Sequence, residues 1–214
     1  MKIKKISGLL AAVVLTVGLA GCTSGAQLPE GDVKIVNQQV QGVVELLLES
    51  ANYGNDKSTV ASMVLPKDSQ YDINLFAEKY LNGELVETKE IANYTTETIE
   101  KDSITHIIIN TAKLNDGEAD KSIYSIAEID RENTEDSKNP EYKISKFYGE
   151  AIDFDSKSSL TQVGKNLDEE AALVGLVKFK EDDSEKAEIN LDSYKDEVSK
   201  YSEATIIKVK VTKK

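Results

Sequence analysis

The sequence has few of the residues that make cross-links or metal centres. Among its 214 residues there are one cysteine, one histidine, three prolines and no tryptophan. A single cysteine cannot form a disulfide within the chain, and a lone histidine lacks the partner ligands that a histidine-based metal centre needs. So few prolines, with no proline- or serine-rich tract, argue against a long disordered stalk. These absences favour a globular domain built around an apolar core.

Motifs of the common enzyme classes are also missing. The chain has no Gly-x-Ser-x-Gly elbow, no Walker phosphate loop and no His-Glu-x-x-His. Carboxylates for glycoside hydrolysis are plentiful but none stands out, and aromatic residues, which form platforms for sugar rings, make up only 6%. We therefore expect no enzymatic activity, no catalytic residue and no cofactor. An envelope-acting hydrolase that uses dispersed carboxylates is the alternative.

The chain is acidic, with a formal net charge of −12. This charge repels phosphate backbones, so we expect no nucleic-acid partner. It attracts cations, and Asp153-Phe154-Asp155 begins like a calcium loop. However, Lys157 stands where the third oxygen ligand belongs, and Gly164 replaces the closing glutamate. We expect no metal site, and a calcium-dependent module with ligands from separate loops remains an alternative.

The N-terminus has the features of an export signal. Three lysines are followed by an uncharged run over residues 6–19, and the run ends in Leu19-Ala20-Gly21-Cys22. The run is shorter than the roughly 20 apolar residues of a membrane-spanning helix. Leu19-Ala20-Gly21-Cys22 resembles the lipobox of bacterial lipoproteins. The resemblance implies cleavage before Cys22 and lipidation of that cysteine, with palmitate among the acyl chains.

The resemblance also implies a location and a division of the chain. We expect a signal peptide at residues 1–21, a tether at 22–31 and a single domain at 32–214 that faces the extracytoplasmic side of the cell membrane. The charged stretch 131–140 is an alternative boundary between two small β domains. One domain is favoured, because each half would bury little apolar surface and has no disulfide.

The start of the domain predicts one N-terminal helix, from Asp32 as its cap to about Ser50. Apolar residues recur there at spacings of three and four, as on one helix face: Val33, Val36, Val40, Val43 and Leu47. A strand over residues 44–48, where apolar residues recur at period two, is the alternative.

The remainder of the domain changes to a period of two, which is typical of strands. We expect strands at residues 59–65, 71–78, 85–91, 103–111, 123–129, 142–148, 173–179, 187–191 and 205–211. Asn82-Gly83 is a strong hairpin signal, because a type I′ turn needs positive φ at both positions. Residues 192–201 are expected to form a short helix or a long loop. Roughly nine strands without long helices predict a mostly β fold, an antiparallel β-sandwich of immunoglobulin-like or related type.

Tyrosine is the most distinctive residue type for binding. Several tyrosines alternate onto the face opposite the apolar set, and we single out Tyr124, Tyr142 and Tyr148 as a binding face. Tyrosine favours interfaces because its ring supplies contact area while its hydroxyl stays bonded. The alternative is that tyrosine simply fills sheet faces, given its high β propensity.

Two other features have plain structural interpretations. His106 shares a strand face with Ile104 and Ile108, and we expect a structural histidine. Lys208 and Lys210 alternate with apolar residues in the last strand, which predicts an edge strand with lysines on its wet face. Contact of these lysines with anionic lipid or polymer is the alternative.

The sequence as a whole predicts a membrane-anchored lipoprotein that acts as a binding or structural module in the bacterial cell envelope. Its expected partners are the lipid bilayer, through acylated Cys22, and an envelope protein.

Overall fold

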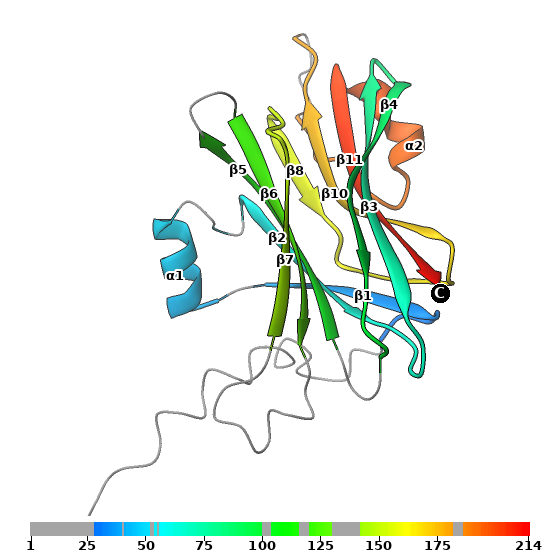
Figure 1. Ribbon diagram of the computed structural model, residues 1–214. Helices are drawn as coiled ribbons and strands as arrows, with labels where there is room; N and C mark the ends of the chain where they lie inside the picture. Colours follow the sequence, from blue (N-terminus) through cyan, green and yellow to red (C-terminus); the bar gives the residue numbers. More distant parts are fainter. Residues whose placement is uncertain are drawn as a thin grey trace, which may run out of the picture.

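The computed structural model describes residues 28–39, 41–51, 54, 56–99, 104–115, 120–129, 142–181 and 186–214. The described chain forms two antiparallel sheets and a few short helical segments. Figure 1 shows the sheets as facing layers. The predicted signal peptide, Cys22 and the alternative boundary at 131–140 lie outside the described residues.

One sheet has six strands in the order β7-β6-β5-β2-β1-β9. Its strands are β1 (Val33–Gln38), β2 (Ser58–Val64), β5 (Ile104–Asn115), β6 (Asp120–Ile129), β7 (Tyr142–Glu150) and β9 (Gln162–Lys165). All neighbouring strands pair antiparallel.

The other sheet has five strands in the order β4-β3-β11-β10-β8. Its strands are β3 (Tyr71–Leu81), β4 (Glu84–Thr95), β8 (Ser156–Ser159), β10 (Glu170–Lys178) and β11 (Glu203–Lys213). The predicted hairpin between β3 and β4 is confirmed: Asn82 and Gly83 have φ of 50° and 92°, and Leu81 pairs with Glu84. The last strand, β11, lies in the middle of its sheet between β3 and β10.

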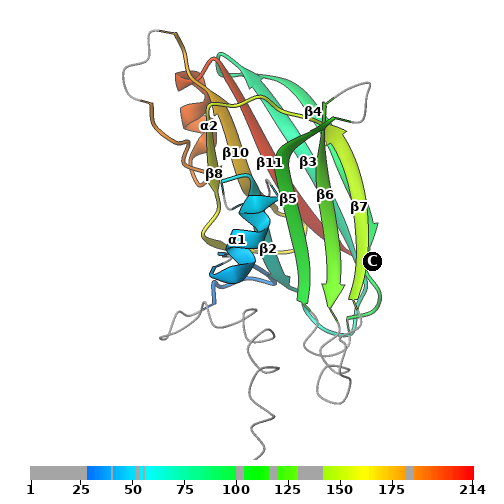
Figure 2. The ribbon, with the colours of Figure 1, turned by 90° about the vertical axis from the view of Figure 1, so that its left-hand side faces the viewer.

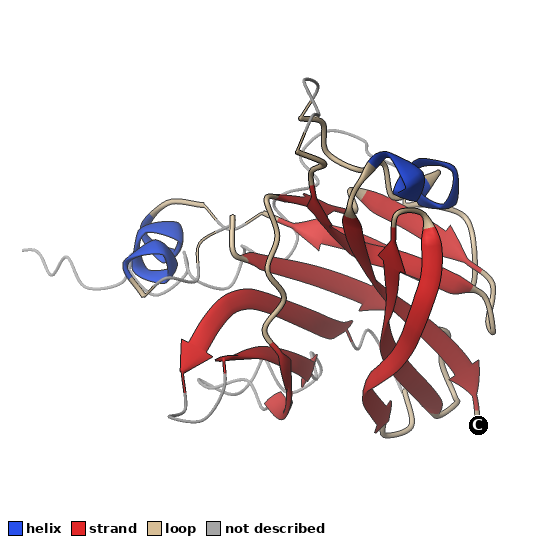
Figure 3. Ribbon diagram, turned by 90° about the horizontal axis from the view of Figure 1, so that it is seen from above, coloured by secondary structure: helices blue, strands red, loops and turns tan. Residues whose placement is uncertain are grey.

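The two sheets share one apolar core. Ile35 and Ile107 contribute to it from the six-stranded sheet, and Leu75 and Leu173 from the five-stranded sheet, all fully buried. Seen from above, the strands form two layers with this core between them (Figure 3). Period-two alternation explains the arrangement, because it puts every second side chain of a strand on the same face. The predicted mostly β, antiparallel fold is confirmed.

A second apolar cluster covers the outer face of the five-stranded sheet. Tyr80 and Ile206 from the strands pack there against Ile189, Tyr194 and other residues of the segment 187–202. This segment contains α2 (Tyr194–Glu197) and a 3-10 turn (Val198–Lys200). In Figure 2, α2 lies beside β10. The middle of the five-stranded sheet is therefore covered on both faces, whereas residues 84–90 of its edge strand β4 are exposed.

The predicted strand at 187–191 is wrong. Residues 187–190 have no regular structure, and 191 begins a turn. Ile189 is nevertheless 2% exposed and packs closely on β10: a Cβ added at Gly175 would lie 2.5 Å from Ile189 Cγ2. The apolar residues of this segment pack on the outer face of the sheet and do not form another strand of it. The local spacing of apolar residues is the same in both cases, so it does not distinguish them.

The predicted N-terminal helix is also wrong over its first part. Residues 33–38 form strand β1, and the helix α1 (Val43–Ser50) comes after it. Val33 and Ile35 are buried at period two, and β1 pairs with β2 on one side and β9 on the other. Hydrogen bonding to these two strands stabilises the extended conformation, although the apolar residues are also spaced as on a helix. The helix begins only after Gly42, which has a φ of 72°.

The helix α1 contributes little to the core. Three of its apolar side chains are largely exposed: Val43, Leu46 and Leu47. Figures 1 and 3 show α1 projecting from the side of the sheets. In the described part of the chain, no helix is long and apolar enough to cross a membrane.

Two short strands were not predicted. β8 belongs to the five-stranded sheet and β9 to the six-stranded sheet, so the chain passes from one sheet to the other between Ser159 and Gln162. Each strand has four residues and few apolar ones, and therefore leaves no periodic signal. This crossing positions one wall of the pocket described below.

Candidate functional site

Lys208 is a buried cation on the central strand of the five-stranded sheet. Its neighbours Ile207 and Val209 face the core between the sheets, so Lys208 faces the outer side, where only 3% of its side chain is exposed. The predicted wet-face lysine on an edge strand is therefore wrong for Lys208. β11 is not an edge strand, and segment 187–202 covers the face toward which Lys208 points.

Lys208 is held by carboxylates and aromatic rings. Its Nζ donates to Glu78 Oε1 at 2.9 Å and also to Glu170 Oε2. The same Nζ lies 5.3 Å from the ring centroid of Phe76 and 5.6 Å from that of Tyr194, within cation–π range. An ammonium group with several such partners is fixed in place.

Glu78 is saturated in the same way. Its Oε1 accepts from Lys208, and its Oε2 accepts from the hydroxyls of Tyr80 at 2.8 Å and Tyr194 at 3.0 Å. A buried carboxylate is tolerated only when its lone pairs are used, and here both oxygens are bonded.

The pKa values of this cluster reflect a balance between burial and hydrogen bonding. Burial favours the neutral form of Glu78, but hydrogen bonds from Lys208, Tyr80 and Tyr194 outweigh it and lower its pKa. Burial likewise opposes the charge on Lys208, but bonds to Glu170 and Glu78 outweigh it and raise its pKa. Burial and Glu78 raise the pKa of Tyr80 well above its ordinary value. At neutral pH the lysine is an ammonium ion and cannot act as a nucleophile or base.

A pocket of about 660 Å³ opens beside Lys208 on the outer face of the five-stranded sheet. Strand residues Ser158, Ala172 and Lys208 contribute to it, and segment 188–196 forms another wall. Uncharged hydrogen-bonding residues are common in the lining: Ser158, Ser159, Thr161, Gln162, Asn190 and Ser193.

Ser158 carries an unused hydrogen-bonding group. Its Oγ is buried and has no partner among the described residues. Buried hydroxyls in folded proteins are nearly always bonded, and leaving one unpaired costs about 1–3 kcal/mol. Ser158 lines the pocket, but its Oγ itself is shielded from solvent.

The charges around the pocket favour one class of ligand. Four acidic residues line it, Glu170, Glu188, Asp192 and Asp196, against three lysines, Lys165, Lys195 and Lys208. Lys208 is already neutralised by its two carboxylates. The pocket therefore disfavours anions and favours neutral or cationic polar molecules.

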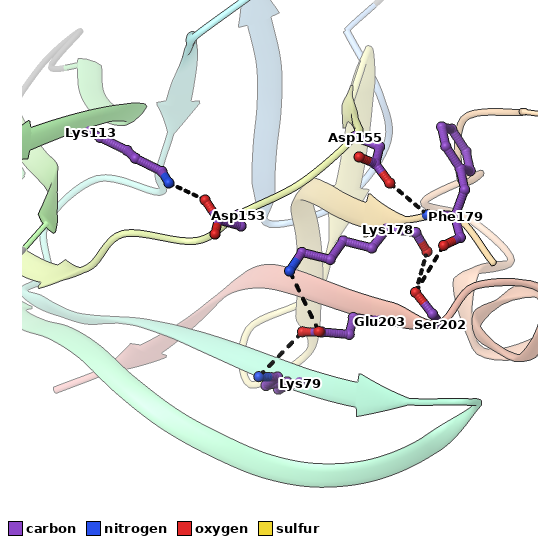
Figure 4. Close-up of polar contacts among 8 residues, drawn as sticks. All are labelled: Lys79, Lys113, Asp153, Asp155, Lys178, Phe179, Ser202 and Glu203. Carbon is purple, nitrogen blue, oxygen red and sulfur yellow. Dashed lines mark hydrogen bonds and ion pairs between the residues drawn. The ribbon is translucent and has the colours of Figure 1, made fainter. Parts of the chain in front are cut away.

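A second concavity, the inter-sheet cleft, encloses about 400 Å³ and is lined by residues of both sheets. Ala77, Lys79 and Thr205 line it from the five-stranded sheet, and Tyr124 and Tyr148 from the six-stranded sheet. Figure 4 shows the polar contacts around it, including the ion pairs of Glu203 with Lys79 and Lys178.

The three predicted binding tyrosines do not form one exposed face. Tyr124 faces the core at 2% exposure, and burial raises its pKa to about 12. Its predicted outward orientation is wrong, because it shares the inner face of β6 with the fully buried Ile126. Tyr148 also borders the cleft, but it pairs with Ile123, so its side chain projects from the opposite face of the sheet, where it is 63% exposed. Tyr142 begins β7, and its side chain lies outside the described residues.

The histidine and the acidic sequence candidates have bonding partners. His106 Nδ1 lies 2.8 Å from Ser62 Oγ, as expected of a structural histidine. Asp153 pairs with Lys113, and Asp155 accepts from the backbone N–H of Phe179 at 2.9 Å (Figure 4). Within the described ranges, no group of three or more His, Cys, Asp or Glu residues could hold a metal ion.

A hydrolase would need a carboxyl group with a raised pKa to serve as its acid. The resolved pKa shifts of carboxyl groups in the described chain are all downward: Asp72, Glu78, Glu150, Asp153, Glu169 and Glu197. Hydrogen bonds to each carboxylate outweigh its burial.

Sequence reasoning missed the cluster around Lys208. A signal was present: Phe76, Glu78 and Tyr80 place an acid within an aromatic stripe, and Lys208 lies within an apolar strand. Two opposite charges inside apolar strands suggest a buried pair, but the pairing of β3 with β11 had to be known to join them.

Comparisons of the chain with protein-family models, curated proteins and solved structures find no match. The fold and the site together define a β domain with a polar pocket on one sheet and a cleft between its sheets.

Proposed function

We propose that this protein is a lipid-anchored module of the bacterial cell envelope that binds a small polar ligand in the outer-face pocket. We assign its two sheets to a sandwich of immunoglobulin-like or related type. The observation that carries the proposal is a pocket of about 660 Å³ that is lined largely by hydrogen-bonding side chains and lies beside the fully bonded Lys208.

The pocket is preorganised for binding. Lys208 is held by Glu78, Glu170 and two aromatic rings, so it does not need to be ordered when a ligand arrives. The opposite wall is also fixed, because Ile189 and Leu191 pack on the bare backbone of Gly175. A rigid polar pocket with acidic surroundings suits a neutral or cationic polyhydroxyl compound of about the size of a sugar.

The anchor gives this binding a location. Acylation of Cys22 would hold the domain at the membrane, since two or more acyl chains anchor a protein stably. Residues 22–31 would reach at most about 35 Å when fully extended. The pocket would therefore operate within a short distance of the outer surface of the membrane.

A charge series on one sugar frame tests the proposed ligand class. We would titrate the full chain in lipid nanodiscs with glucosamine, glucose and glucuronate, and measure binding by calorimetry. We expect glucosamine and glucose to bind and glucuronate not to bind, because the pocket is acidic. Preferential binding of glucuronate, or binding of none of the three, would contradict the proposal.

A matched pair of variants locates the binding. Ala172→Leu fills part of the outer-face pocket and should weaken binding at least tenfold. Ala151→Leu adds the same atoms to the inter-sheet cleft and should leave sugar binding unchanged. Equal effects of the two substitutions would show that the pocket is not the site.

A further inference from the structure

We infer that the helix α1 makes a second membrane contact, by inserting its apolar side chains into the lipid bilayer that holds the acylated Cys22. We refer to the side chains of Val43, Leu46 and Leu47 as the apolar face of α1. The inference rests on the lipid anchor of the proposed function, and it adds the part of the folded domain that meets the bilayer.

The apolar face of α1 is open to solvent in spite of its large aliphatic side chains. Val43, Leu46 and Leu47 are 72%, 68% and 63% exposed. Their spacing of three and four residues places them side by side on the same face of the helix. Neighbouring exposed apolar side chains on a folded domain mark a surface of interaction.

The backbone around α1 holds this face away from the sheets. Gly42 precedes the helix at φ 72°, and a Cβ built there would meet no atom of the described chain within 4 Å. Figures 1 and 3 show the helix projecting from the side of the domain. A Cβ built at Gly54 would lie 2.7 Å from Glu49 Cγ, so this acid is turned toward the segment that follows the helix. The apolar face is thus the part of α1 that is free to meet a membrane.

The size and shape of the apolar face favour lipid over a protein partner. A helix of eight residues with three large side chains supplies much less than the roughly 800 Å² per partner of a stable protein interface. The face is also convex, because it lies on a projecting helix, and a fluid bilayer needs no matching surface. Amphipathic helices lie in the membrane interface with their apolar side chains buried about 5–10 Å deep.

The lipid anchor would keep α1 close to the bilayer. Residues 22–27 join the acylated cysteine to the first described residue, and they reach at most about 21 Å. Strand β1 then spans about 17 Å and leads to α1 (Figure 1). So short a connection raises the effective concentration of α1 at the membrane surface to roughly the millimolar range. A face of three side chains, too small to hold a free protein on a membrane, can then dock.

The charges of α1 predict how the contact depends on lipid and salt. The helix carries Glu45 and Glu49 and no lysine or arginine. Its docking must therefore come from burial of apolar surface, and we expect no requirement for anionic lipid. The contact should also persist at high salt, which screens charges but does not weaken apolar burial.

Fluorescence can test the contact cleanly, because the chain has no tryptophan and a single introduced indole reports on its own surroundings. We would reconstitute the lipidated full chain with Leu47→Trp in vesicles of phosphatidylcholine brominated in its acyl chains. Tyr148→Trp is the matched control, because Tyr148 is also 63% exposed but lies on the edge strand β7. We expect a blue-shifted emission and several-fold quenching by bromine for Leu47→Trp and neither for Tyr148→Trp. Quenching should be equal in neutral and anionic vesicles.

A second set of variants tests whether the apolar face causes the docking. Val43→Trp should be quenched in the same way, and addition of Leu46→Gln and Leu47→Gln should abolish its quenching. The melting temperature should not change, because these side chains are exposed. Addition of Leu85→Gln and Val86→Gln is the matched control on β4, where both side chains are also exposed, and it should leave the quenching of Val43→Trp intact.

Each opposite result has a distinct meaning. A Leu47→Trp protein that stays on salt-washed vesicles without quenching would overturn the inference and leave the anchor standing. A blue shift without quenching, together with a crosslinked dimer, would show that a second copy covers the apolar face. Quenching in anionic vesicles alone would show that charge, and not the apolar face, draws the domain to the membrane. Protein that does not stay on the vesicles would refute the anchor, and the inference with it.

Discussion

Lys208 and Glu78 show how a single buried pair can decide the character of a surface. Each charge alone would be expensive to remove from water, and their mutual contact is tolerated because two tyrosine hydroxyls and Glu170 complete the bonding. Because of this pair, the outer face of the five-stranded sheet, which is otherwise largely apolar, carries charged groups beside the pocket.

Removing one partner should be costly, and removing both should cost much less. We expect Lys208→Met to lower the free energy of unfolding by about 3–5 kcal/mol, because Glu78 then stays buried without its cation. The double variant Lys208→Met/Glu78→Gln should recover most of that loss. Urea denaturation of the two single variants and the double variant measures the coupling. A loss below about 1 kcal/mol in Lys208→Met would show that the pair is solvated.

Lys157 should make stability depend on pH in the alkaline range. Burial lowers its pKa to about 8, against the opposing effect of Asp56 and Glu188, and its Nζ donates to the Ser58 carbonyl. Between about pH 8 and 10.5 the unfolded chain keeps this proton while the folded chain releases it. The contribution of Lys157 to the free energy of unfolding therefore increases as the pH rises from about 8 to 10.5, and it decreases again as the pH falls to 8.

Lys157→Met should remove this contribution. Melting temperatures of the protein and the variant, measured from pH 7 to pH 10, should differ most at pH 7, where the variant is the more stable. The difference should shrink toward pH 10. A constant difference would show that Lys157 titrates in the same way in both states, and Lys180→Met serves as the exposed control.

At the scale of elements, the β3–β4 hairpin depends on a glycine for two reasons. Gly83 has φ 92°, and a Cβ there would lie 2.9 Å from Ser199 Cα. Gly42 also has a positive φ, 72°, but a Cβ there meets no atom within 4 Å. Substitution of Gly42 therefore tests backbone strain alone, whereas substitution of Gly83 tests backbone strain together with a steric clash.

We expect Gly42→Ala to cost about 1 kcal/mol from the positive φ alone. Gly83→Ala should cost at least about 1 kcal/mol more, because the backbone of Ser199 must shift as well. Thermal and urea denaturation measure both. Equal losses of unfolding free energy in the two variants would mean that the 3-10 turn Val198–Lys200 can move away from residue 83 without destabilising the protein.

Local sequence predicted elements well where the residues of a strand alternate between apolar and polar or where a turn has characteristic residues. The alternation over residues 71–78 and the Asn82-Gly83 turn both correspond to what the structure shows. The local sequence pattern gave wrong predictions where apolar residues pack against segments that are distant in the sequence. Residues 33–38 pair with β2 and β9, and residues 187–191 cover β10, and neither relation is visible in a local period.

At the scale of the whole molecule, hydrogen bonds between the two sheets supplement the packing of the shared core. Tyr94 on β4 donates to Glu128 on β6 at 2.7 Å, and Thr59 on β2 bonds Ser159 on β8 at 2.7 Å. These bonds lie at the margins of the shared core. The domain can therefore keep both of its concavities without a covalent cross-link.

The proposed anchor predicts where the whole protein is found. Cys22→Ala should release the protein from membranes or misplace it, because no acyl chain could then be attached. Membrane and soluble fractions after a salt wash measure the distribution. A Cys22→Ala protein that stays tightly bound to membranes would contradict the anchor.

The sequence by itself determined the antiparallel β character and the hairpin turn, because alternation and positive-φ residues act over a few neighbouring positions. Only the tertiary structure decided which faces of the strands are buried. Strand β11 alternates in the same way whether its second face meets water or segment 187–202, and that segment comes from elsewhere in the chain. For this reason Lys208 looked like a surface lysine, and Tyr124 like a surface aromatic. Burial is set by which segments pack together, and a local pattern does not contain that information.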